Sequence, residues 1–108
     1  HLGQEDMEIT TARALIGKKV IIGGTANDLV EVQGLCYDKV DYIGLGPYAY
    51  TKTKQNIAEP LGIAGYQAIM ESIKTEIPIY AIGGIKVKDV SALMKTNIYG
   101  IKGKKSVF

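Results

Sequence analysis

The sequence predicts an α/β fold of repeated parallel βα units, and three observations support this class. Short apolar runs alternate with longer stretches in which apolar residues recur at helical spacing. The short runs are nearly continuous in apolar character, as expected of strands buried on both faces of a parallel sheet. Each run also ends at or near glycine, which allows a turn or a ligand to approach the backbone closely. This order is typical of parallel βα units.

Length, charge and cysteine content limit the functions that the chain can have. With 108 residues, 46% of them hydrophobic, the chain is at most one domain with a real core. A net charge of +2 is too small for a general nucleic-acid binder, and no run of about 18 apolar residues could span a membrane. The single cysteine excludes an internal disulfide, and the opening residues resemble no signal peptide. We therefore expect a cytoplasmic protein that binds neither nucleic acid nor membrane.

The first third of the chain predicts a loop, a helix and a strand. Residues 1–7 fit the exit from a strand into a loop. A helix is predicted over residues 10–17, because apolar residues recur there at helical spacing and Gly17 can end it. The apolar run 19–24 then predicts a strand buried on both faces.

The next helix is predicted to begin after the glycines of that strand. Asn27 or Asp28 can cap it, since a short polar side chain accepts from the free amides of a first turn. Its inner face is predicted to carry Leu29, Val32 and Cys36. A second strand is predicted over residues 40–46.

A polar loop leaves this second strand and contains the sequence Thr51-Lys52-Thr53-Lys54. Two hydroxyls and two ammoniums in four residues can bind one small anion, such as a phosphate or diphosphate. Taken alone, the same four residues could equally form a solvated loop.

The last part of the chain predicts two more helices and two more strands. A strand is predicted over residues 77–84, with Pro78 at its entrance, where no ladder hydrogen bond is needed. A final strand is predicted over residues 98–101. The apolar faces of the helices before these strands are predicted to carry Ile63, Tyr66, Ile69, Met70 and Ile73, and then Val87, Val90, Leu93 and Met94.

The candidate functional residues follow the predicted strands. Ligands of parallel βα folds bind at the carboxyl ends of the strands. We expect Asp6, Thr25, Thr51, Lys52, Thr53 and Lys54 at that end, together with Gly24, Gly46 and Gly84.

Five motifs occur in the order and spacing of one enzyme family. They are residues 1–7 (HLGQEDM), 22–26 (IGGTA), 41–47 (DYIGLGP), 51–54 (TKTK) and 81–85 (AIGGI). Over roughly residues 1–100 the chain resembles thiamine-phosphate synthase, also called thiamine-phosphate pyrophosphorylase. The resemblance implies a single partial TIM-barrel domain over residues 1–108, with strands five to eight of the barrel and without its N-terminal half.

The resemblance also implies a reaction. The family joins hydroxymethylpyrimidine diphosphate to a thiazole phosphate, which gives thiamine phosphate and releases pyrophosphate. The diphosphate leaves first, and the thiazole nitrogen captures the resulting pyrimidine-methylene cation. Such a step needs Mg²⁺ and cationic groups rather than a nucleophilic side chain. His1, the only histidine, is therefore expected to be a strand-end residue.

The site residues implied by the resemblance bind a metal and two phosphate groups. Asp6 matches a magnesium ligand, although alone it could be a surface acid beside Glu5 and Glu8. Without the resemblance, Thr25 reads as a helix cap and Gly84 as a tight turn. The implied assignments are Thr25 and Lys54 to the diphosphate, and Thr51, Thr53, the backbone around Lys52, and Gly84 to the thiazole phosphate.

Two departures from the family pattern lead to further expectations. The family's other diphosphate contacts and first magnesium ligand match positions upstream of His1, so we expect 1–108 alone to be inactive unless it self-associates or pairs with the complementary half-barrel. Residues 102–108 form a basic tail where an apolar strand is usual.

Two alternatives remain open at this point. A thiazole tautomerase from the same superfamily depends on a histidine where this chain has Asn27, and it lacks the Thr/Lys set, so the synthase is favoured. A non-catalytic phosphate-binding α/β remnant would also retain these motifs.

Overall fold

The structure is a computed structural model of the chain, and it describes residues 3, 8–9, 11, 21–50 and 59–102. In these residues four strands alternate with helices in a single parallel sheet of order β1-β2-β3-β4. The predicted α/β class with parallel βα units is confirmed. The elements are β1 (Gly23–Ala26), α2 (Leu29–Tyr37), β2 (Tyr42–Leu45), α3 (Gly62–Ser72), β3 (Ile79–Ala81), the 3₁₀ turn η1 (Val87–Asp89), α4 (Val90–Met94) and β4 (Gly100–Ile101).

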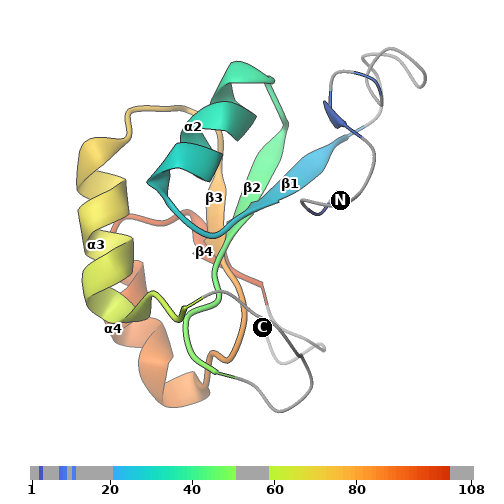
Figure 1. Ribbon diagram of the computed structural model, residues 1–108. Helices are drawn as coiled ribbons and strands as arrows, with labels where there is room; N and C mark the ends of the chain where they lie inside the picture. Colours follow the sequence, from blue (N-terminus) through green and yellow to red (C-terminus); the bar gives the residue numbers. More distant parts are fainter. Residues whose placement is uncertain (1–2, 4–7, 10, 12–20, 51–58, 103–108) are drawn as a thin grey trace.

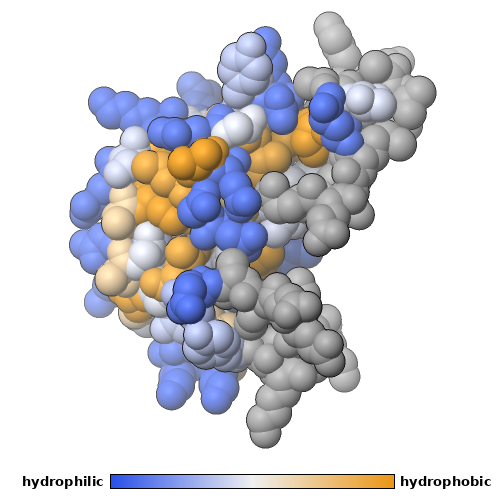
Figure 2. Space-filling model, in the orientation of Figure 1, coloured by the Kyte–Doolittle hydropathy of each residue, from blue (hydrophilic) through white to orange (hydrophobic). Residues whose placement is uncertain are grey.

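One face of the sheet is covered by helices. Figure 1 shows α2, α3 and α4 on the same side of the four strands. Alternate strand residues point toward these helices, and Ile43, Leu45 and Ile79 are almost fully buried there. The helices contribute Val32, Leu35, Tyr66, Ile69 and Leu93 to the same core. Apolar side chains also remain visible between α2 and α3 on the surface in Figure 2.

The opposite face of the sheet carries a row of tyrosines. The rings of Tyr42 and Tyr80 meet edge to face with their centroids 6.0 Å apart. Tyr99 adds a second edge contact to Tyr80 at 5.4 Å, and the Lys102 ammonium lies 5.4 Å from the Tyr42 ring centroid. Such contacts stabilise aromatic clusters beyond the burial of their area. Among the described residues, no helix covers this face in Figure 1.

The first strand begins later than the sequence predicts. A strand was expected over residues 19–24, but the ladder with β2 starts only at Gly23, opposite Tyr42. Ile21, expected to be buried, is 72% exposed. An isoleucine that precedes the ladder has no neighbouring strand to cover it, so hydrophobic character alone could not fix the start of the strand.

Gly24 was expected at the carboxyl end of this strand, but it lies inside β1 on the helix side. A Cβ atom at this position would come within 2.6 Å of the Leu35 side chain of α2. The absence of a side chain at Gly24 therefore serves the packing of a helix and not the approach of a ligand.

The helix before the last strand also differs from prediction. Instead of one continuous helix, a 3₁₀ turn leads into the five-residue α4. Leu93 is fully buried as expected, but Val87 is 71% exposed and Met94 is 43% exposed. Val87 lies in the 3₁₀ turn and Met94 is the last residue of α4, so this short helix buries only Leu93 of the predicted stripe.

Other predictions are confirmed or lie outside the described residues. Asp28 caps α2, since its carboxylate accepts a hydrogen bond from the Glu31 amide at 2.8 Å. Pro78 precedes β3 as expected. Most of the helix predicted over residues 10–17 and the tail 103–108 lie outside the described residues.

Candidate functional site

The predicted site residues fall into two groups. Thr25 and Gly84 are described by the structure, whereas Asp6 and the four residues 51–54 lie outside the described residues. Even so, the chain on both sides of the Thr/Lys segment is described, and it shows where that segment begins and ends.

Thr25 lies in β1, one residue before the strand ends at the carboxyl edge of the sheet. It was predicted to follow the strand, but it is the third residue of β1 and pairs with Gly44 of β2. Because Gly24 faces α2, the alternation of the strand directs Thr25 to the face without helices. In the same row across the sheet lie Tyr80 and Gly100.

The loop that carries the Thr/Lys segment has a closed neck at the carboxyl end of β2. The Leu61 amide donates to the Pro47 carbonyl at 2.8 Å, and the Gly62 amide donates to the Tyr48 carbonyl at 3.1 Å. Farther out, the Tyr50 hydroxyl donates to the Glu59 carboxylate at 3.4 Å. The loop therefore leaves and rejoins the fold at one place.

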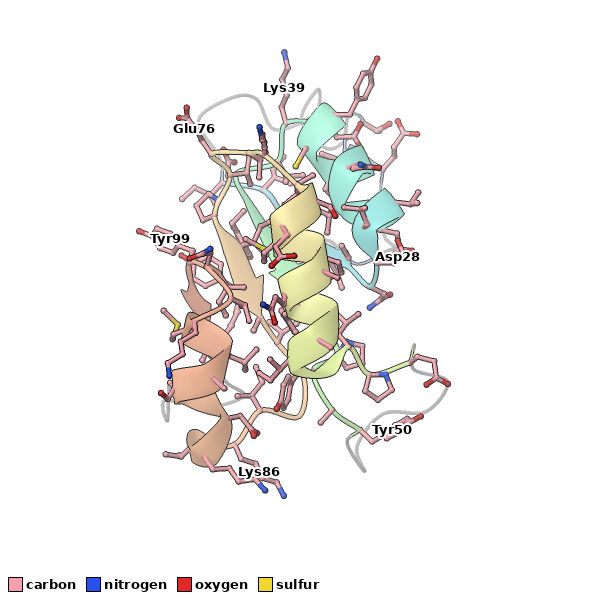
Figure 3. The ribbon with its side chains drawn as sticks, turned by 90° about the vertical axis from the view of Figure 1, so that its left-hand side faces the viewer. Asp28, Lys39, Tyr50, Glu76, Lys86 and Tyr99 are labelled. Carbon is pink, nitrogen blue, oxygen red and sulfur yellow. The ribbon has the colours of Figure 1, made fainter. Side chains whose placement is uncertain are left out.

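This neck packs directly on the turn that follows β3. The Tyr48 amide donates to the carbonyls of Ile82 and Gly83 at 3.1 and 2.9 Å, and the Ala49 amide donates to Gly83 at 3.1 Å. Figure 3 shows Tyr50 and Lys86, which flank the two segments, at the same end of the molecule. The sequence prediction that the Thr/Lys loop and the glycine turn share one edge is thus supported by the residues that border them.

Gly84 occupies a backbone conformation that favours glycine. Its φ is 74°, and a Cβ atom there would collide with the backbone of Ala49, with the carbonyl carbon only 2.9 Å away. Within the described part of the chain, the Gly84 amide donates to no backbone carbonyl.

Tyr48 and Asp89 form a contact that the sequence did not reveal. The Tyr48 hydroxyl donates to Oδ1 of Asp89 at 3.3 Å, and Oδ2 of the same carboxylate accepts from the Lys86 amide at 3.0 Å. Burial and the neighbouring Asp89 charge raise the pKa of Tyr48, so the phenol stays protonated as a donor at neutral pH. The two residues are 41 positions apart, and no local pattern connects them.

Asn27 forms hydrogen bonds on the other side of the same edge. Its side-chain Nδ2 donates to the Gly46 carbonyl at 2.6 Å, and its own amide donates to the Glu31 carboxylate at 2.7 Å. The side chain thus links the end of β1 to the end of β2. Asp28, and not Asn27, is the residue that caps α2.

The opposite end of the sheet has a shallow hollow of different character. It is lined mainly by apolar residues together with Thr75, Glu76 and Asn97. Glu76 projects at the end of the molecule away from Tyr50 in Figure 3. Because the residues that line this hollow include a carboxylate and no lysine, the hollow is unsuited to a phosphate.

The described residues contain neither a metal-ligand cluster nor a membrane-spanning helix. In the part of the chain that the structure describes, no group of three or more His, Cys, Asp or Glu side chains is placed to hold a metal ion. No helix among those residues is long and apolar enough to cross a bilayer.

The fold defines the class of the protein: a parallel βα chain in which the described ends of the loops after β2 and β3 meet at the carboxyl edge of the sheet. The family model for thiamine monophosphate synthase matches residues 1–106. The chain belongs to the thiamine monophosphate synthase family.

Curated relatives agree with this assignment and show how much of them the chain covers. Thiamine-phosphate synthase of Flavobacterium psychrophilum is 49% identical over 104 residues, which are 94% of this chain and 50% of that protein. The corresponding proteins of Flavobacterium johnsoniae and Bacteroides thetaiotaomicron are 46% and 44% identical over the same length. The chain spans about half the length of the curated relatives that it matches.

Solved structures show that the fold is part of a TIM barrel. Thiamine phosphate pyrophosphorylase from Pyrococcus furiosus superposes with a TM-score of 0.77 at 34% identity, over 93% of this chain and 46% of that one. A second structure, described as native KDPGal, superposes with a TM-score of 0.69 at 12% identity, over 96% of this chain and 45% of that one. The second likeness concerns the fold alone.

Proposed function

We propose that this chain supplies the phosphate-binding part of a thiamine-phosphate synthase. The reaction joins hydroxymethylpyrimidine diphosphate to a thiazole phosphate, and the products are thiamine phosphate and pyrophosphate. The observation that carries the proposal is the packing of the loop neck on the Gly83 turn, beside a Gly84 amide to which the described residues offer no backbone acceptor. Family membership adds the identity of the substrates.

The chain's residues would divide between two phosphate groups. Thr51, Thr53 and the Gly84 amide would hold the thiazole phosphate, because two hydroxyls and a backbone amide match the acceptors of one phosphate. Thr25 and Lys54 would bind the diphosphate, with the Lys54 ammonium opposing the charge that develops as it departs. The Lys52 side chain would remain solvated.

The bond changes in this reaction need no nucleophile from the chain. The carbon–oxygen bond to the diphosphate breaks with the electron pair on oxygen, and the thiazole nitrogen then donates its pair to the same carbon. The protein's task is to bind, orient and exclude water from the cation. The absence of histidine and cysteine contacts among the described edge residues is compatible with that task.

Magnesium is the metal that the family implies, and Asp6 is its proposed ligand in this chain. When bound, the ion would neutralise diphosphate charge. The described residues offer no cluster of three ligands, so Asp6 would need partners outside them. We therefore assign no step to the metal.

We further propose that 1–108 does not turn over alone, and that its partner is either a second copy or the complementary half of the barrel. Support comes from the coverage of half of each relative and from the tyrosine face without helices. The single free cysteine is compatible with the cytoplasmic location that we propose.

A complementation assay tests the function. The chain is co-expressed with the N-terminal half of the Flavobacterium psychrophilum relative, and thiamine phosphate is measured by chromatography with both substrates and Mg²⁺ present. We expect product from the combination and none from either part alone. Turnover by 1–108 as a single chain per particle would contradict the proposed inactivity. A folded complex without product would instead favour the second candidate, a non-catalytic phosphate-binding α/β remnant.

A further inference from the structure

The hollow at the amino end of the sheet has the size of a ligand site and a local negative charge. Its volume is about 340 Å³, within the range of small-molecule sites, roughly 300–1,000 Å³. The end of α3, the loop before β3 and the loop before β4 line it. Glu76 is the one charged residue of this lining, although the whole chain has a net charge of +2.

The polar side chains that line the hollow can all accept hydrogen bonds. Within the described part of the chain, the side chains of Glu76, Asn97 and Tyr99 have no hydrogen-bond partner. Thr75 Oγ1 accepts from the Ile77 amide at 3.1 Å and keeps a second lone pair. Figure 3 shows Glu76 and Tyr99 at the same edge of the molecule. The lining therefore suits a ligand that is rich in hydrogen-bond donors.

The carboxyl end of α3 adds negative charge at the same place. Met70 lies in the last turn of this helix and Ile73 is its C-cap, and both line the hollow. A helix carries a partial negative charge at this end, and the last turn of α3 contains no basic residue that would offset it. Among the described residues, no backbone amide donates to the Met70 or Ser72 carbonyl. Two independent features, the helix end and the Glu76 carboxylate, thus favour a cation.

The remaining lining is apolar and restricts the kind of cation. Ile73, Ile77 and Pro78 line the hollow and are only half-buried, so a ligand could cover them further. A hydrated metal ion would gain nothing from such a surface, and the described residues offer no group of three metal ligands. An ammonium group attached to an apolar body matches both parts of the lining.

We propose that this hollow binds a small organic ammonium ion, with its apolar body on Ile73, Ile77 and Pro78 and its N–H groups toward Glu76 and Asn97. The site lies at the end of the sheet opposite the proposed phosphate site and shares no residue with it. The inference therefore goes beyond the proposed function and does not depend on it.

Titrations of the chain with three benzyl compounds, followed by backbone amide NMR shifts, test this inference. Benzylamine, benzyl alcohol and benzoate share a ring and differ in charge. We expect benzylamine to bind with a Kd on the order of 1 mM and to shift the amides of Thr75, Asn97 and Tyr99. Benzyl alcohol should bind about fivefold more weakly, as expected for loss of one exposed ion pair, and benzoate more weakly still.

Three variants locate the charge that is responsible. Glu76→Gln should weaken benzylamine binding about fivefold and leave benzyl alcohol unchanged. Asp38→Asn is the matched control, because it removes a carboxylate at the carboxyl end of α2 that does not line the hollow. Asn97→Gly removes the amide side chain without straining the backbone, since φ is 72° there, and should weaken benzylamine about threefold.

Four outcomes would overturn the inference. They are benzoate binding as tight as that of benzylamine, equal losses in Glu76→Gln and Asp38→Asn, shifts confined to amides away from the hollow, and no saturable shift with benzylamine. The first and the last need no variant, so the test holds even if a substitution prevents folding. Pyrophosphate binding at the other end of the sheet should be the same in Glu76→Gln as in the wild type.

Discussion

Three residues near the carboxyl edge of the sheet have different structural roles. Gly84 needs a positive φ and space beside the Ala49 backbone, so it has a structural reason to be glycine whatever it binds. Tyr66 is fully buried and its hydroxyl donates to the Leu45 carbonyl. The polar group inside the core therefore has a hydrogen-bond partner. Tyr48 is half-buried and reaches a carboxylate.

Replacement of Gly84 by alanine is expected to destabilise the protein by about 2 kcal/mol. Alanine is strained at a positive φ, and its Cβ would collide with the Ala49 backbone. Gly34→Ala is the control. Gly34 lies exposed in α2 with nothing within 4 Å of its Cβ position, so alanine there should stabilise by about 0.5 kcal/mol. Urea unfolding midpoints compare the two. Equal effects in the two variants would contradict the strained turn.

The buried Tyr66 predicts a specific dependence of stability on alkaline pH. Burial raises the pKa of Tyr66 above its ordinary value of 10.0. Between about pH 10 and the folded pKa, the unfolded chain loses its phenolic proton and the folded chain keeps it. The stabilisation is therefore complete below about pH 10 and is lost as pH rises further.

The measurement is the free energy of unfolding of the wild type minus that of Tyr66→Phe, followed across pH. This difference should be constant near neutrality, at about 1 kcal/mol, and should fall above about pH 10. Titration of the other tyrosines cancels in the difference. A difference that rises with pH would show that Tyr66 ionises more easily in the folded state, contrary to its burial.

At the scale of the elements, periodicity predicted which segments are helices and strands, but not where each begins. In α3 the predicted stripe is confirmed at Tyr66 and Ile69, whereas in α2 it is confirmed at Val32 but missed the buried Leu35. The start of β1 was misplaced because Ile21 is as apolar as a core residue, yet no strand pairs with it among the described residues. The 3₁₀ turn η1 begins at the Lys86–Asp89 contact, which spacing in the sequence does not show.

The same limit applies to the candidate site. Motifs predicted that the Thr/Lys loop and the Gly84 turn meet, because the carboxyl ends of parallel strands share an edge. They could not predict the Tyr48–Asp89 bond, which joins residues that only the folded chain brings together. They also misassigned Gly24, since a glycine needed for helix packing and one needed for a ligand look alike in sequence.

The cap of α2 gives a prediction at this scale. Asp28→Ala removes the acceptor for the Glu31 amide and should cost about 1 kcal/mol of unfolding free energy. Asp38→Ala changes the same residue type at the other end of α2, where a negative charge opposes the helix dipole. It should be neutral or slightly stabilising. Thermal unfolding of both variants checks the contrast, and a greater loss in Asp38→Ala would refute it.

At the scale of the whole molecule, the described helices cover one face of the sheet and leave the tyrosine face uncovered. The helix side forms a continuous core from β1 to β4, which accounts for the close superposition on part of a TIM barrel. The tyrosine side is the face that a closed barrel would enclose. The proposed phosphate binding at the edge and the closure of a barrel can each be measured without the other.

The central claim is that this chain carries a phosphate site, and pyrophosphate titration by calorimetry tests it most directly. Lys54→Ala removes the proposed diphosphate ligand, whereas Lys52→Ala removes the same charge two residues away, where the side chain is proposed to be solvated. We predict that Lys54→Ala weakens pyrophosphate binding about tenfold or more, while Lys52→Ala changes it less than twofold, as expected for a charge-assisted bond against a solvated charge. Equal losses in the two variants, or no loss in Lys54→Ala, would contradict the account.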